Sequence, residues 1–347
     1  MHNLLAIYGR TLTIVICLMV LFWVLVMILV PQVVMLHNSL WWSEKSKDAA
    51  AVTLRIDELY NDVGVLELDL AAAGDDEKAK IAAEIESKRA EIAELESKEV
   101  TAVRVYGLAN YTRMSGLHFG IFVKTMFFSA LVTVLALVVC YPIAFAAAQV
   151  FTGEKAALLM LGLVVPYAIN ELLRIYAWLM ILDYQGVINS ALAWIGLVDF
   201  SKGTAIPFLQ SPGAVFAAMI YAYILFMVFP IYNTLETLDR NQLDAARDLG
   251  ASTARIHWRV AIPHAKPGIA VGCIMTFMLS AGSYSVPQIM TRGQGGDWFS
   301  QLIYRQFFEA NNWNIGAAYA FTLLIACLVF IFIVMRLFGV GIREIAR

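Results

Sequence analysis

Six stretches of this sequence are apolar over about 20 residues, the length that an α-helix needs to cross the hydrocarbon core of a bilayer. They fall at 11–36, 123–148, 156–182, 213–235, 268–290 and 317–338. The composition agrees, because 60% of the 347 residues are hydrophobic and only 15% are charged. We therefore expect an all-α integral membrane protein with six transmembrane helices, which disfavours a soluble enzyme and excludes a disordered chain.

The distribution of Lys and Arg between alternate loops predicts the orientation of these spans. One set of short loops carries ten of these residues, and the opposite set, with the flanks of the second span, carries five. Cytoplasmic loops are enriched in Lys and Arg, so both termini are expected in the cytoplasm. The stretch 11–36 is longer than the apolar region of a signal peptide, and no small-residue cleavage site follows it. We expect it to be an uncleaved first span.

Residues 44–104 differ from the rest of the chain in charge. They hold nine Lys and Arg against sixteen Asp and Glu, a net charge of −7, whereas the remainder carries +5. Apolar residues recur there at alternating steps of four and three, the spacing of a coiled-coil seam. Before the turn at Gly74 and after it, these residues are Val52, Ile56, Leu59, Val63, Leu66 and Leu70, then Ile81, Ile85, Ile92 and Leu95, with Lys88 in the seam.

This pattern predicts two antiparallel helices, roughly 44–72 and 76–103, that form a coiled-coil hairpin on the outer side of the membrane. Such a hairpin is either a solvated structural spacer or a docking arm for another protein. The sequence leaves both interpretations open.

The basic loop between the fourth and fifth spans predicts a helix, a turn and a second helix. Residues 238–249 favour a helix, and Gly250 can adopt the left-handed conformation that ends one. A hydroxyl residue is expected to cap the second helix and two prolines to stop it: Ser252 or Thr253, and Pro263 and Pro267. One face of the loop carries only small side chains, so another protein can approach its backbone closely. These residues are Ala245, Ala246 and Gly250.

This loop resembles the EAA loop, E-A-A-x3-G-x9-I-x-L-P, of the permease subunits of type I ABC importers. The matching residues, at the same spacing, are Asp244, Ala245, Ala246, Gly250, Val260, Ile262 and Pro263. Asp replaces Glu, Val replaces Ile and Ile replaces Leu. The resemblance implies that loop 238–267 sits in a groove on an ATPase subunit, where Asp244 would pair with basic or amide groups. Without that partner the loop is a surface helix hairpin.

The resemblance extends over roughly 110–336 and is closest to the spermidine/putrescine-type permeases. The supporting stretches are 108–111, 165–166, 173–178, 186–189, 282–287 and 312–318. The coiled-coil hairpin lies outside the resemblance. The first span, the hairpin and the family-like region together predict an N-terminal transmembrane helix (1–38), a periplasmic coiled-coil insert (39–107) and a permease core (108–340).

The resemblance also implies a cellular location and a set of partner proteins. The chain would lie in the bacterial inner membrane and work with a cytoplasmic ABC ATPase dimer, a second and related permease chain, and a periplasmic solute-binding protein. The solute would be a polyamine or a related amine or opine.

Five residues within the spans are candidates for lining the path. Glu171 and Arg174 lie three residues apart on one helical face, and ionisable groups inside a span are functional candidates by default. They either neutralise each other or face a hydrated cavity. Aromatic faces attract organic cations by roughly 0.5–2 kcal/mol, and three are candidates: Tyr176, Tyr223 and Tyr284. Tyr284 is the first choice, because Gly and Pro in 282–287 can break the helix at membrane depth.

The sequence carries no recognisable catalytic constellation. It lacks a G-x4-G-K-[ST] phosphate cradle, a G-x-S-x-G elbow and histidines at metal-ligand spacing. ATP and Mg are therefore expected on the partner ATPase, with no cofactor or metal in this chain, and nothing indicates a nucleic-acid partner. We expect a transporter subunit that forms half of the pathway and is not an enzyme. The alternative is a self-contained secondary transporter or channel, which would need coupling carboxylates or an inverted repeat.

Overall fold

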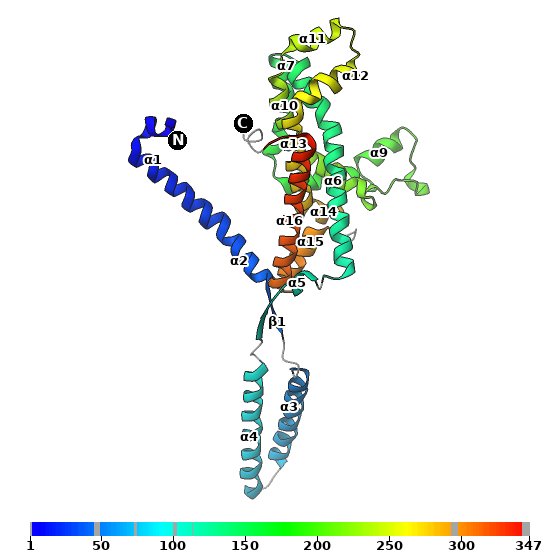
Figure 1. Cartoon of the computed structure of the whole chain (residues 1–347). Helices are drawn as coiled ribbons and strands as arrows, with labels where there is room; N and C mark the ends of the chain where they lie inside the picture. The colour runs from blue at the N-terminus through cyan, green and yellow to red at the C-terminus, as the bar shows by residue number, and fades with distance from the viewer. Residues whose placement is uncertain are drawn as a thin grey trace. The chain divides into compact units, whose positions relative to one another are not determined.

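The computed structural model describes residues 2–44, 49–72, 75–99, 103–112, 114–292 and 298–341. Gly74 of the predicted turn, and the Arg113, Arg343 and Arg347 that entered the predicted orientation, lie outside these residues. The chain divides into two compact units, 1–113 and 114–347. Both consist mainly of helices (Figure 1), and each is described by itself.

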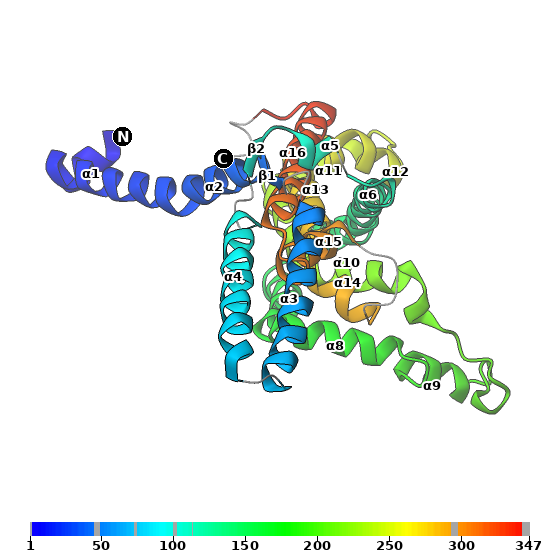
Figure 2. The same ribbon diagram turned by 90° about the horizontal axis from the view of Figure 1, so that it is seen from below.

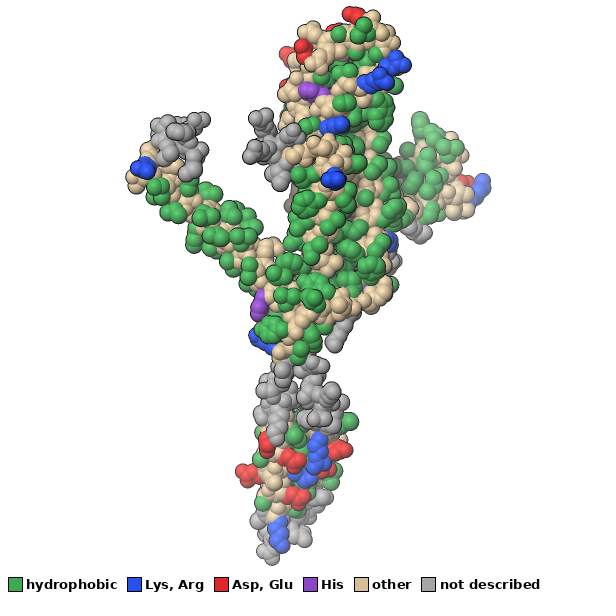
Figure 3. Space-filling view, viewed as in Figure 1, with side chains coloured by type: hydrophobic (Ala, Val, Ile, Leu, Met, Phe, Trp, Pro, Cys, Tyr) green, Lys and Arg blue, Asp and Glu red, His purple; other side chains and the backbone are tan. Residues whose placement is uncertain are grey.

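The described helices include five that are long and apolar enough to cross a membrane. They are Gly9–Ser39, Gly116–Val150, Pro212–Glu236, Thr253–Gly282 and Trp313–Phe338. A sixth candidate consists of two helical segments, Glu154–Ala168 and Glu171–Trp194, which are bent by 99° at the break between them. Figure 3 shows hydrophobic side chains spread over the outer surface of the helical part of the second unit. The all-α membrane architecture predicted from the apolar stretches is therefore confirmed.

The third predicted span, 156–182, is wrong as a continuous helix. Helix α7 (Glu154–Val164) passes into a 3₁₀ turn (Val165–Ala168), and α8 (Glu171–Leu182) starts afresh. Pro166 lies at the start of the 3₁₀ turn, where its missing N–H and fixed φ disfavour continuation of the α-helix. Asn170 then accepts a hydrogen bond from the Leu172 N–H at 2.9 Å and caps α8 in a new direction.

The first unit contains a long apolar helical stretch and a helical hairpin. Its elements are α1 (His2–Val24), a π-helical turn (Leu25–Leu29), α2 (Val30–Ser39), β1 (Trp41–Glu44), α3 (Ala49–Ala72), α4 (Asp75–Glu99), β2 (Val103–Tyr106) and α5 (Ala109–Thr112). Helices α3 and α4 lie side by side in both views (Figures 1 and 2). Their contact is made by nine apolar residues of the predicted seam, namely Ile56, Leu59, Val63, Leu66, Leu70, Ile81, Ile85, Ile92 and Leu95. The side chain of Val52, the first residue of that seam, lies outside the described residues.

Two short strands at the base of the hairpin replace the helix ends predicted at 44 and 103. Trp41 pairs with Tyr106 and Glu44 with Val103 in an antiparallel ladder. The buried Asn110 side chain donates to the Ser39 and Trp41 carbonyl oxygens at 2.9 and 2.8 Å. β-Branched and aromatic residues favour strands, and this amide satisfies backbone groups next to them.

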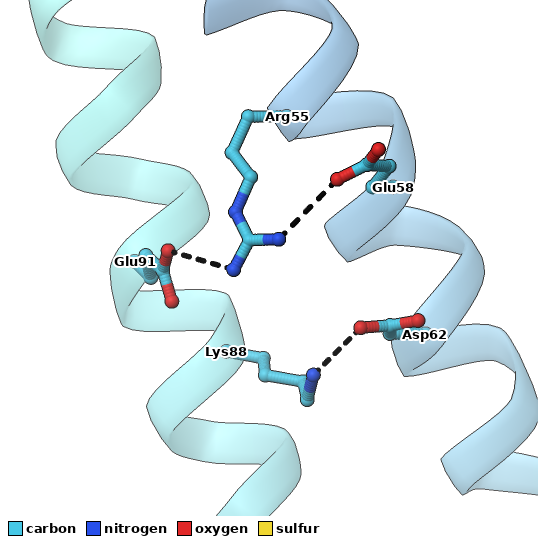
Figure 4. A network of polar contacts seen from close by, with 5 residues as sticks. All are labelled: Arg55, Glu58, Asp62, Lys88 and Glu91. Atoms are coloured by element: carbon cyan, nitrogen blue, oxygen red, sulfur yellow. Dashed lines mark hydrogen bonds and ion pairs between the residues drawn. The ribbon is translucent and has the colours of Figure 1, made fainter.

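Ion pairs link α3 and α4 beside the apolar contact. Lys88 Nζ lies 2.7 Å from Asp62 Oδ2, and the Arg55 guanidinium lies 3.5 Å from Glu91 on the other helix and 3.3 Å from Glu58 on its own helix (Figure 4). Exposed pairs of this kind stabilise little individually. They select one alignment of the two helices, however, because a shift along the seam separates every pair that crosses it.

The second unit is a helical bundle. Its elements are α6 (Gly116–Phe145), a π-helical turn (Ala146–Val150), α7, α8, α9 (Val187–Trp194), 3₁₀ turns (Phe200–Lys202, Phe208–Gln210), α10 (Pro212–Glu236), α11 (Arg240–Asp248), α12 (Thr253–Ile256), a π-helical turn (His257–Ala261), α13 (Ile262–Gly282), α14 (Ser285–Met290), α15 (Phe299–Tyr304), a π-helical turn (Arg305–Glu309) and α16 (Trp313–Phe338). Helices α10 and α13 approach closely at Gly268, where an added Cβ would collide with the Pro230 carbonyl oxygen.

Candidate functional site

An elbow of two short helices, α11 and α12, follows α10. Asp239 caps α11 by accepting a hydrogen bond from the Asn241 N–H at 3.0 Å. Gly250 has a φ of +75°, the left-handed conformation predicted for it. Ser252 occupies the position before α12, although its hydroxyl makes no capping hydrogen bond.

The second helix of the elbow does not stop at Pro263 or Pro267, so that expectation is wrong. Helix runs from Thr253 through Gly282. Pro263 is the second residue of α13, which directly follows the π-helical turn, so the continuous helix passes through it. Pro267 removes one intrahelical hydrogen bond, and the carbonyl that loses it belongs to the exposed Pro263.

The EAA-like residues divide into an anchoring set and an exposed set. Ala246, Val260 and Ile262 pack against the hydrophobic core that also contains the buried Leu243 and Ile256. The exposed set contains Asp244, Ala245, Gly250 and Pro263. Within it the Asp244 carboxylate pairs with Arg247 at 2.6 Å, with both side chains more than half exposed.

Two large apolar side chains on the elbow were not singled out from the sequence. Leu249 is 88% exposed and Trp258 is 72% exposed. Large apolar side chains that are exposed on a subunit are typical of a protein-binding surface. Leu249 belonged to the predicted helix, and its exposure follows from its place directly before the Gly250 turn.

A cavity of about 550 Å³ lies between the broken third span and two neighbouring spans. Its lining includes four of the five candidate pathway residues, namely Glu171, Arg174, Tyr223 and Tyr284, together with Tyr167, Phe226 and Ser283. Tyr176, the fifth candidate, does not line it, and its side chain is 51% exposed. The break between α7 and α8 brings Glu171, at the start of α8, to this cavity.

Glu171 and Arg174 do not neutralise each other in the described structure. The Arg174 guanidinium lies 4.1 Å above the Tyr167 ring. Its Nε and Nη1 atoms are buried and have no hydrogen-bond acceptor among the described residues. Tyr167, which was not among the sequence candidates, donates its hydroxyl hydrogen to the Ala222 carbonyl oxygen at 2.7 Å.

Tyr284 lies at the break between α13 and α14, as the Gly- and Pro-containing stretch predicted. The helix ends at Gly282, and Ser283 is extended with a ψ of 123°. The Tyr284 ring is partly buried and contacts the Tyr304 ring at a centroid distance of 4.6 Å. Irregular backbone therefore borders a cavity, the setting in which it is tolerated at membrane depth.

A second cavity of about 590 Å³ contains none of the candidate pathway residues. Lys124, Phe128, Phe216 and Trp298 contribute to its lining, as do Asp183 and Arg292, which form an ion pair at 3.1 Å. Among the described residues, no group of three or more His, Cys, Asp and Glu side chains could hold a metal ion. Four of the five candidate pathway residues instead line the cavity around Glu171.

Residues 141–343 match the family of binding-protein-dependent transport system inner membrane components. The chain belongs to this family. The inner membrane component is 35% identical over 222 residues to the spermidine/putrescine transport system permease protein PotB of Escherichia coli (strain K12), covering 64% of this chain and 78% of the relative. It is 30% identical over 228 residues to the protein of the same name from Haemophilus influenzae, covering 65% and 78%.

A solved structure supports the fold of this inner membrane component. A bacterial ABC transporter involved in the import of the acidic polysaccharide alginate matches with a TM-score of 0.52 and 17% identity, over 68% of this chain and 84% of the other. The chain is thus a multi-pass permease subunit of an ABC importer. Such subunits carry no ATPase site of their own. The family match begins at residue 141 and leaves the hairpin outside it.

Proposed function

We propose that this subunit conducts an organic amine of the polyamine class through the cavity around Glu171. The observation that carries the proposal is the meeting of a carboxylate with aromatic faces at one cavity: Glu171 with Tyr223 and Tyr284. A carboxylate attracts ammonium groups, and tyrosine faces add cation–π attraction. The names of the relatives from E. coli and H. influenzae, which specify spermidine and putrescine, support the same solute class.

The elbow is the proposed coupling surface for a cytoplasmic ABC ATPase dimer, which would hold the ATP and Mg. Asp244, Ala245, Gly250 and Pro263, which are exposed, would face the ATPase, and Ala246, Val260 and Ile262, which pack on the core, would support the elbow from the membrane side. The exposed Leu249 and Trp258 support this assignment, because a groove on the ATPase would cover them. Closure of the ATPases would then move the elbow and tilt the permease.

The remaining partners follow from the same proposal. A second permease chain would complete the pathway, and a periplasmic binding protein would deliver the solute; a bacterial alginate ABC transporter has been solved in complex with its alginate-loaded periplasmic protein. The proposed division is an N-terminal span (1–38), a periplasmic insert (39–107) and a permease core (108–340), with both termini in the cytoplasm of a bacterium.

Co-purification with the ATPase subunits and solute-stimulated ATP hydrolysis test the coupling role. Leu249→Ser removes an exposed apolar contact of the elbow, and we expect it to lower both recovery of the ATPase and stimulation of hydrolysis. Leu197→Ser, which changes an equally apolar side chain that is 70% exposed outside the elbow, is the matched control. Equal behaviour of the two variants, or a chain that transports without any ATPase, would refute the proposal.

A further inference from the structure

Tyr167 holds Arg174 away from the carboxylate that would ordinarily pair with it. The Arg174 guanidinium lies over the Tyr167 ring at 4.1 Å. The ring is fixed in turn, because its hydroxyl donates to the Ala222 carbonyl oxygen at 2.7 Å and accepts from the Leu225 N–H at 3.4 Å. Two contacts with the α10 backbone therefore determine where the aromatic face lies.

Glu171 and Arg174 are placed so that they could form an ion pair. They are separated by three residues in α8, so they share a face, and both line the same cavity. The structure instead leaves two guanidinium nitrogens, Nε and Nη1, buried without an acceptor. The Tyr167 ring is the group that competes with Glu171 for this cation.

We propose that Tyr167 is a positioning residue that keeps Arg174 off Glu171 and so leaves the Glu171 carboxylate free for the ammonium group of the solute. The inference rests on the proposed function, because it takes the solute to be an organic amine. Arg174 then has two positions: on the Tyr167 ring the cation site is open, and on Glu171 it is neutralised. The tethered guanidinium also keeps solute binding weak, since its charge repels an ammonium group within the same cavity.

Direct binding of 1,4-diaminobutane tests this inference. The assembled permease–ATPase complex is placed in nanodiscs without the binding protein, and the dissociation constant is measured by calorimetry. Tyr167→Leu removes the ring, releases Arg174 to Glu171 and should weaken binding about tenfold, within the range of a cation–π contact. Adding Arg174→Gln to Tyr167→Leu removes the competing cation and should restore most of the lost affinity. Tyr167→Phe keeps the ring and should lose less than Tyr167→Leu.

Two further variants make the outcome decisive. Arg174→Gln alone should bind the diamine at least as tightly as the wild type, and it tests the inference even where Tyr167→Leu does not assemble. Tyr176→Leu, on the same helix but away from the cavity, should leave binding unchanged. An unaffected Tyr167→Leu, a double variant as weak as Tyr167→Leu, or weaker binding by Arg174→Gln would overturn the role of Tyr167.

Glu171→Gln separates this inference from the proposed function. If Glu171→Gln weakens diamine binding while the double variant fails to recover, only the role of Tyr167 fails. If Glu171→Gln binds the diamine as tightly as the wild type, Glu171 does not bind the ammonium group of the solute, and the proposed function fails together with the role of Tyr167.

Discussion

Lys88 Nζ lies 2.7 Å from the Asp62 carboxylate, across the contact between α3 and α4. The Lys88 ammonium, by hydrogen bond and by charge, lowers the pKa of Asp62 below its ordinary value. A carboxylate whose pKa is lower in the folded state stabilises that state above its unfolded pKa, which is about 3.9 for Asp. This contribution is lost as the pH falls below that value and through the lowered folded pKa.

We therefore predict that the hairpin loosens in acid below about pH 4, and that Asp62→Asn loosens it already at neutral pH. Hydrogen-exchange protection of residues 54–66 and 81–95 in the full chain measures this, after correction for the intrinsic pH dependence of exchange. Asp57→Asn, an exposed change on the same helix, is the control. Equal protection of Asp62→Asn and the wild type at pH 7 would contradict the prediction.

The close approach of α10 and α13 predicts the effect of Gly268→Ala. The added methyl group meets the Pro230 carbonyl oxygen and Thr234 Oγ1, so the helices must separate. Overpacking of this kind costs about 1–3 kcal/mol, and we expect a lower midpoint of thermal unfolding in detergent. Gly162→Ala, which meets no atom within 4 Å, should leave the midpoint near that of the wild type. A stable Gly268→Ala protein would show that the two helices are farther apart.

The left-handed backbone at Gly250 predicts that two substitutions there impair coupling to different degrees. An added Cβ meets no atom within 4 Å, but the φ of +75° strains any residue with a side chain. The strain is roughly 1–2 kcal/mol for an ordinary residue, greater for β-branched Val and smaller for Asn. Gly250→Val should therefore uncouple ATP hydrolysis from solute more strongly than Gly250→Asn. Solute-stimulated ATPase activity of the assembled complex checks the order, and the reverse order would count against an elbow that couples through its turn.

The place of Tyr284 at the helix break predicts that its ring contributes to solute binding. Tyr284→Ala should weaken diamine binding by roughly 0.5–2 kcal/mol, the range of a cation–π contact, whereas Tyr284→Phe keeps the ring and should lose less. Calorimetry on the assembled complex measures the difference. A Tyr284→Ala complex that binds as tightly as Tyr176→Ala would remove Tyr284 from the pathway.

Features that depend on local periodicity were predictable from the sequence. The seam from Ile56 to Leu95 forms the hairpin contact because residues three and four apart share a helical face. Gly250 was predictable because few other residues tolerate its conformation. Tyr284 was predictable because Gly and Pro mark helix breaks.

Features that depend on tertiary geometry were missed. The 99° bend before Glu171 arises from Pro166 and Asn170 acting together, whereas the hydropathy of 156–182 is that of one uninterrupted span. Tyr167 was missed because its ring meets Arg174 only after this bend, and Tyr176 points elsewhere although its sequence spacing did not exclude it. The strands at Trp41–Glu44 and Val103–Tyr106 pair across about 60 residues, a separation that local propensity does not report.

ATP-driven uptake of radiolabelled 1,4-diaminobutane into proteoliposomes tests the central claim most directly. The liposomes contain this subunit with its partner permease and ATPase, and the binding protein is supplied outside. The account predicts uptake that needs ATP, is not inhibited by 1,4-butanediol and falls several-fold in Glu171→Gln, while Tyr176→Leu retains it. Uptake without ATP, or equal uptake by Glu171→Gln and the wild type, would contradict the account.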